Sequence, residues 1–64
     1  TIREAFIEWR QNEITQKVML VIRRNVEDLK EKLANEAGAD PASDRYIVGY
    51  ITACRDLLNV DIEE

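Results

Sequence analysis

The 64-residue sequence has no histidine, one proline, two glycines and one cysteine, Cys54. A single cysteine excludes a disulfide within the chain, and without histidine it cannot complete a zinc site of the Cys/His type. A chain this short buries little of its surface, and small domains usually gain stability from disulfides, metals or association. Because a disulfide and a zinc site are excluded, we expect the chain to associate with a copy of itself or with another protein.

Long apolar runs and positive charge are also scarce. The longest apolar run, Val18 to Ile22, is far shorter than the roughly 18 residues of a membrane span. Thirteen acidic and nine basic residues give a net charge of −4, which disfavours nucleic-acid binding. No signal peptide is visible, and a free cysteine fits a reducing cytoplasm. With 45% hydrophobic and 34% charged residues, the chain is expected to be globular.

Apolar residues recur at helical spacing over three segments of the chain. The first helix is predicted over residues 2–11, because Thr1 and Glu4 match a capping box. The second helix is predicted over residues 13–36, with Asn12 as its N-cap. One continuous helix through Asn12 is the alternative, since a sequence determines helix boundaries only weakly.

A turn is expected between the second helix and the third. Gly38 is the predicted left-handed stop of the second helix. Asp40, followed by the proline, is the predicted start of the third helix, over residues 41–59. An acidic tail follows at residues 60–64, in which only Ile62 is expected to pack back. Two long helices joined by a short link form an antiparallel hairpin.

Each helix of the predicted hairpin has a heptad seam of apolar residues. The seam residues are Thr15, Met19, Ile22, Val26, Leu29 and Leu33 in the second helix, and Ile47, Ile51, Cys54 and Leu58 in the third. Cys54 is therefore expected in the core and not as a reactive thiol. The predicted fold class is all-α. A short N-terminal helix packs on an antiparallel helical hairpin in one domain, residues 1–64, which dimerises into a helical bundle.

Further apolar residues flank both seams, and one hairpin cannot bury them all. We expect Phe6 and Trp9 of the first helix to cover Ile14, Val18 and Val21 on one flank of the second. The remaining surplus predicts a contact surface for another protein. Its expected residues are Trp9, Val18, Val21, Tyr46, Gly49, Tyr50 and Ala53. The two tyrosines could instead belong to the core, with their hydroxyl groups reaching water.

Gly49 stands alone inside the third predicted helix, where glycine costs about 1 kcal/mol relative to alanine. Gly49 and Ala53 form a strip of small residues, which lets another helix approach closely. We therefore predict a tight crossing at Gly49, either by the first helix near Phe6 or Trp9 or by a second subunit. A glycine that simply faces solvent is the alternative.

No pattern in the sequence predicts an enzyme. The carboxylates fall on the outer, solvated faces of the predicted helices, so we expect no catalytic residue, cofactor, metal ion or small-molecule substrate. The basic residues form one cluster. Its members are Arg10, Lys17, Arg23 and Arg24, together with Lys30. Arg10, Lys17 and Arg24 have heptad spacing, which favours one face that contacts phosphate or an acidic partner. Charges that only flank an apolar seam are the alternative.

Several short motifs carry a resemblance to a known group of proteins. They are Phe6-x-x-Trp9, Ile14-Thr15 at the start of the long helix, the segment Arg45-Tyr46-Ile47-Val48-Gly49-Tyr50-Ile51, and Arg55-Asp56-Leu57-Leu58. In these motifs the chain resembles small, uncharacterised helical proteins encoded among the virion-assembly genes of tailed bacteriophages. Their usual proline before the hydrophobic–Thr pair is Glu13 here, and both residues suit a first helical turn. The resemblance implies a phage origin and a non-enzymatic role, and it transfers no site residue.

We therefore hypothesise a non-enzymatic helical assembly protein that dimerises, or packs on a partner, through its apolar flank. As an alternative, an acidic phage protein could bind and modulate a host protein through its acidic faces and tail. Nucleic-acid binding through Arg23 and Arg24 is the third hypothesis. The expected location is the host cytoplasm or the virion, without membrane insertion.

Overall fold

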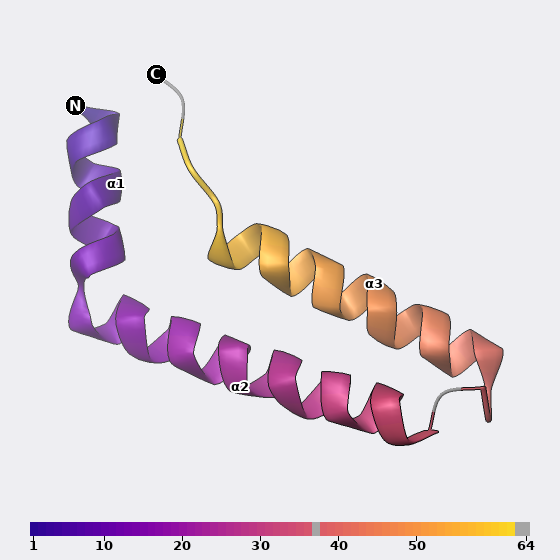
Figure 1. Ribbon diagram of the computed structural model, residues 1–64. Helices are drawn as coiled ribbons and strands as arrows, with labels where there is room; N and C mark the ends of the chain where they lie inside the picture. Colours follow the sequence, from indigo (N-terminus) through magenta and orange to yellow (C-terminus); the bar gives the residue numbers. More distant parts are fainter. Residues whose placement is uncertain (37, 63–64) are drawn as a thin grey trace.

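The chain forms three α-helices and, over the part described here, no strand. The computed structural model describes residues 1–36 and 38–62. Its helices are α1 (Ile2–Gln11), α2 (Glu13–Glu36) and α3 (Pro41–Leu58). α2 and α3 run antiparallel as a hairpin, and α1 stands across the open end of that hairpin (Figure 1). The all-α prediction is confirmed, and each helix boundary lies within one residue of its predicted position.

Asn12 separates α1 from α2. Its backbone is extended, with φ −60° and ψ 137°. Its side-chain oxygen accepts hydrogen bonds from the backbone N–H groups of Ile14 at 2.8 Å and Thr15 at 3.4 Å, as an N-cap does. The amide of Gln16 donates to the carbonyl oxygen of Arg10 near the end of α1. Because these contacts stabilise a break between the helices, the alternative of one continuous helix is wrong. α1 and α2 point in different directions, and we call the bend between them at Asn12 the elbow.

The turn between α2 and α3 has the predicted residues in the predicted roles. Gly38 has a φ of +87°, in the left-handed region that favours glycine. Its N–H donates to a carboxylate oxygen of Asp44 at 2.8 Å, which ties the turn to the first turn of α3. Asp40 accepts a hydrogen bond from the N–H of Ala42 at 3.1 Å, and Pro41 follows at the first helical position. A short, well-capped turn holds the two helices side by side.

The core lies between the two seams, as predicted. Every seam residue of α2 and α3 is buried or half-buried. The centre of the core is Val26, Ile47 and Ile51, against which Cys54 packs as a half-buried thiol. No side chain in residues 1–36 or 38–62 is less than 2% exposed. The core is therefore a single line of contacts along the hairpin, without a deep interior.

The molecule is a single layer of helices. Its Cα atoms extend over 49 × 23 × 11 Å. Two stacked helix layers would need about 13 Å or more in the shortest direction, because packed helix axes lie about 8–10 Å apart and each helix has a Cα radius of about 2.3 Å. The radius of gyration is 15.1 Å, whereas a compact domain of this length has one of about 11 Å. Both faces of the hairpin are consequently open.

Residues 60–62 run beside α1 and are held by it (Figure 1). Arg10 donates to the carbonyl oxygens of Leu58 at 2.8 Å and Val60 at 3.4 Å. Arg3 pairs with Asp61 at 2.7 Å and donates to the carbonyl oxygen of Ile62 at 2.6 Å. The prediction that only Ile62 packs back is therefore wrong, because backbone carbonyls of the tail are bound as well. Positions 63 and 64 of the predicted acidic tail lie outside the described residues.

Candidate protein-interaction face

The flanking residues of α2 and α3 point to the same side of the layer. In both helices each of them directly precedes a seam residue, which places it about 100° around the helix from the seam. The two helices are antiparallel and their seams face each other. The same step of one residue toward the N-terminus therefore leads, in both helices, to the same face of the layer. Together with Trp9 they form what we call the apolar face. Its residues are Trp9, Ile14, Val18, Val21, Tyr46, Tyr50, Ala53 and Leu57.

Exposed apolar side chains are concentrated on this face. Eleven large apolar side chains are exposed in the described chain, and seven of them belong to the apolar face. The other four are Ile2 and Ile7 of α1, and Leu20 and Val48, which directly follow seam residues and therefore lie toward the opposite face of the layer. Scattered exposed apolar residues are ordinary, whereas a contiguous group of them marks an interaction site. The predicted surface residues Trp9, Val18, Val21, Tyr46, Tyr50 and Ala53 are thus brought to one face.

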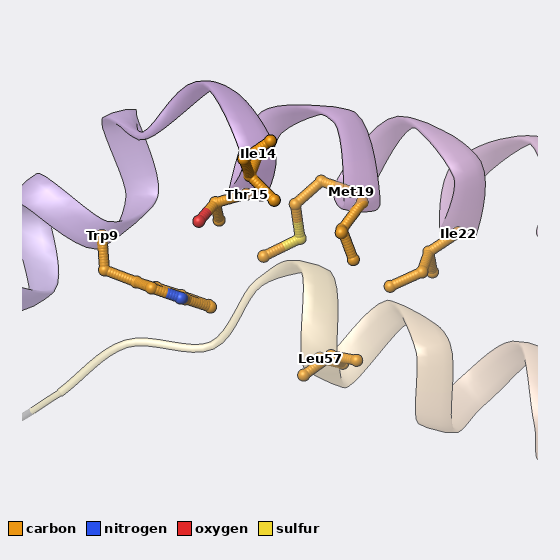
Figure 2. Close-up of a pocket in the computed structure, with 7 residues that line it drawn as sticks. Trp9, Ile14, Thr15, Met19, Ile22 and Leu57 are labelled. Atoms are coloured by element: carbon orange, nitrogen blue, oxygen red, sulfur yellow. The ribbon is translucent and has the colours of Figure 1, made fainter.

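A groove lies in the apolar face at the elbow (Figure 2). Its volume is about 230 Å³. Its lining residues are Trp9, Ile14, Thr15, Val18, Met19, Ile22 and Leu57. The buried Thr15 and Met19 form its floor, Trp9 from α1 closes one end, and Leu57 forms the wall from α3. Phe6 stacks on Trp9 with ring centroids 5.7 Å apart, which holds the indole in place. We call this site the elbow groove.

The first helix does not cover α2 in the predicted way. Ile14, Val18 and Val21 remain 69%, 51% and 54% exposed. The reason is the direction of α1, which the extended Asn12 and the bonds from Arg10 to the end of α3 place across the end of the layer. The predicted lid over these three residues is therefore wrong. The position of α1 instead makes Trp9 one wall of an open groove.

Tyr46 and Tyr50 form a ridge at the opposite end of the apolar face. Their ring centroids lie 6.5 Å apart, and the residues are 72% and 40% exposed. This exposure decides between the two interpretations of the tyrosines, because neither ring belongs to the core. Beside this tyrosine ridge, the flank of α2 is polar. Its residues there are Asn25, Asp28 and Lys32. The apolar face thus has a hollow end and a raised end.

Gly49 lies in open space. A methyl group added at Gly49 would meet no atom within 4 Å. No Cα of α1 lies within 8 Å of a Cα of α3. The predicted crossing by the first helix is therefore wrong, since α1 stands beyond the other end of α3. A crossing by a second subunit stays a prediction.

The basic residues do not form one surface. Arg10 binds the end of α3 and lies over the ring of Phe6, 5.6 Å from its centroid. Lys17 lies 3.9 Å from Glu13 on the same helix. Arg23 and Arg24 are exposed on α2. Heptad spacing does not continue through the break at Asn12, so the structure separates Arg10 from the other basic residues of the cluster.

Two residues of the site were not included in the contact surface predicted from the sequence. Ile14 and Leu57 form opposite sides of the elbow groove. Their positions directly before a seam residue are the signal that identifies them. Within the described ranges, no helix is long and apolar enough to cross a membrane, and no group of three acidic or cysteine side chains could hold a metal ion. Comparison with protein-family models, curated proteins and solved structures finds no match for this chain.

Proposed function

We propose that this chain is a non-enzymatic, phage-type assembly module that works by burying its apolar face against another protein, with self-association as the main mode. The observation that carries the proposal is the concentration of exposed apolar side chains on one face of a single layer. A monomer gains nothing from this arrangement, because water remains in contact with the apolar area. A protein partner that covers the face removes this area from water.

The exposed area of the chain has the size that such an interface needs. The chain exposes 5126 Å². A compact monomer of 7.4 kDa exposes about 4,200 Å². The surplus is about 900 Å², and a stable interface buries about 800 Å² on each partner. One ordinary interface would therefore bring the exposed area down to that of a compact protein.

Sedimentation velocity from micromolar to millimolar concentration tests the proposal, with the parent chain and two variants. Val18→Asp places a charge in the middle of the apolar face and should abolish association, because an unpaired charge cannot be buried. Leu20→Asp is the matched control. Leu20 lies on the same helix with a similar exposure, 45% against 51% for Val18, but follows a seam residue and so lies toward the opposite face. It should leave association intact.

Circular dichroism should show that both variants remain helical. A parent chain that stays monomeric at every concentration would contradict self-association. Equal loss of association in the two variants would show that the apolar face is not the contact surface.

A further inference from the structure

We infer that the occupant of the apolar face is a second copy in an inverted orientation, in which the tyrosine ridge of each copy fills the elbow groove of the other. This inference rests on the proposed function and specifies the partner and the contacts. Its basis is the unlike shape of the two ends of the apolar face, which carries a groove at the elbow and a ridge near the turn.

Two-fold symmetry allows only two simple ways to place this face on itself. Contacts in a two-fold dimer are reciprocal, so a residue that touches a second residue on the partner is matched by the reverse contact. With the hairpins inverted, each helix lies on its own counterpart, so the tyrosine ridge of α3 meets the partner's groove along its Leu57 wall, and this contact occurs twice. With the hairpins in the same direction, groove lies on groove, and the tyrosines lie over the polar flank of α2 at Asn25, Asp28 and Lys32. Only the inverted arrangement fills both grooves and covers the tyrosines with apolar side chains.

The elbow groove is suited to an aromatic ring. An apolar cavity of about 150 Å³ holds benzene, so the groove of about 230 Å³ accommodates a phenol ring. The indole of Trp9 provides an aromatic wall, and aromatic rings pack favourably with centroids about 4.5–7 Å apart. Thr15 places a hydroxyl group on the side of the groove that faces Trp9 (Figure 2). A buried tyrosine hydroxyl needs such a hydrogen-bonding partner.

The charges of the apolar face also favour a second copy over a strongly charged partner. The positions that directly precede seam residues in α2 and α3 contain only two charges, the opposite charges of Asp28 and Lys32. The face is therefore neutral, although the chain carries a net charge of −4. Two such faces do not repel each other, whereas a highly basic or acidic partner finds no matching charge.

Disulfide trapping between copies tests the orientation. A Cys54→Ala background removes the native thiol, and three single-cysteine chains are made in it: Ile14→Cys at the groove, Tyr46→Cys at the ridge and Leu57→Cys at the other side of the groove. The Leu57→Cys chain is mixed with each of the other two and oxidised mildly. A disulfide requires Cα atoms within about 7 Å. Inversion places α3 on α3 of the other copy, so the Leu57→Cys and Tyr46→Cys mixture should give several times more mixed cross-linked dimer than the Ile14→Cys and Leu57→Cys mixture.

The outcomes separate this inference from the proposed function. Predominant cross-linking of Ile14→Cys with Leu57→Cys would establish the same-direction arrangement and overturn the inverted one, while association through the apolar face would stand. Dimers in sedimentation that give neither mixed product would also overturn the inverted arrangement. A chain that is monomeric in sedimentation and gives no cross-link would refute both proposals. Circular dichroism of each variant confirms that the helices are retained.

Discussion

Arg10 should contribute more to stability than any position on the surface of α2, and Arg10→Met tests this. Methionine keeps an unbranched apolar stem but removes the guanidinium that bonds the carbonyl oxygen of Leu58 at 2.8 Å and lies over Phe6. A hydrogen bond from a charged donor contributes about 1.5–3 kcal/mol, and a cation at a helix C-terminus adds about 0.3–1 kcal/mol. Since such contributions overlap, we expect a net loss of about 2 kcal/mol in the free energy of unfolding.

This loss should be large on the temperature scale because the chain is short. The entropy of unfolding is about 2.1 cal/mol/K for each residue, so 64 residues have about 0.13 kcal/mol/K. A change of about 2 kcal/mol then lowers the melting temperature by about 15 °C. The measurement is a thermal melt followed by circular dichroism in dilute protein, because association would itself raise the melting temperature.

Arg24→Met is the matched control for Arg10→Met. Arg24 is exposed on α2 and makes no hydrogen bond or ion pair with the described residues, so its replacement should change the free energy of unfolding by less than about 0.5 kcal/mol. If both variants melted within a few degrees of each other, the contacts of Arg10 with α3 and with Phe6 would not hold the elbow, and the reasoning would be refuted.

Two further substitutions probe the helices themselves. Gly49→Ala should raise the melting temperature of dilute protein by about 7 °C, because alanine favours a helix by about 1 kcal/mol and its methyl group meets nothing within 4 Å. A decrease in the melting temperature that grows with protein concentration would instead place a second subunit at this position. Asn12→Ala should lower the melting temperature by about 7 °C through loss of an N-cap worth about 1 kcal/mol. An unchanged melting temperature with increased helical ellipticity would show that α1 and α2 have merged.

The helices and the core could be predicted because their determinants are local. A seam at steps of three and four residues requires only the geometry of one helix, and the caps at Thr1, Asn12 and Asp40 act within three residues of themselves. The same local register placed Val18 and Tyr50 on one face. The seams, the caps and the shared face could all be predicted without knowledge of the tertiary structure.

The direction of α1 could not be predicted in this way. It depends on bonds between residues far apart in the chain, such as that between Arg10 and Leu58, which are separated by 48 positions. Heptad spacing assigned Arg10 to a basic patch, because a spacing pattern contains no information about contacts with a distant segment such as the C-terminal end of α3. The elbow groove was missed for the same reason, since Trp9 and Leu57 line one groove only because this long-range contact fixes the position of α1.

The two walls of the elbow groove belong to helices whose relative position depends on charged contacts near the surface. Trp9 is part of α1, and α1 is attached to the end of the chain by Arg10 and by the exposed pair of Arg3 with Asp61. Dissolved ions weaken the exposed Arg3–Asp61 pair, with a screening length of about 8 Å at physiological ionic strength, while they act much less on the part-buried hydrogen bonds from Arg10 to neutral carbonyl oxygens. We therefore expect added salt to release the far end of α1 first, while Arg10 continues to hold Trp9 at the groove.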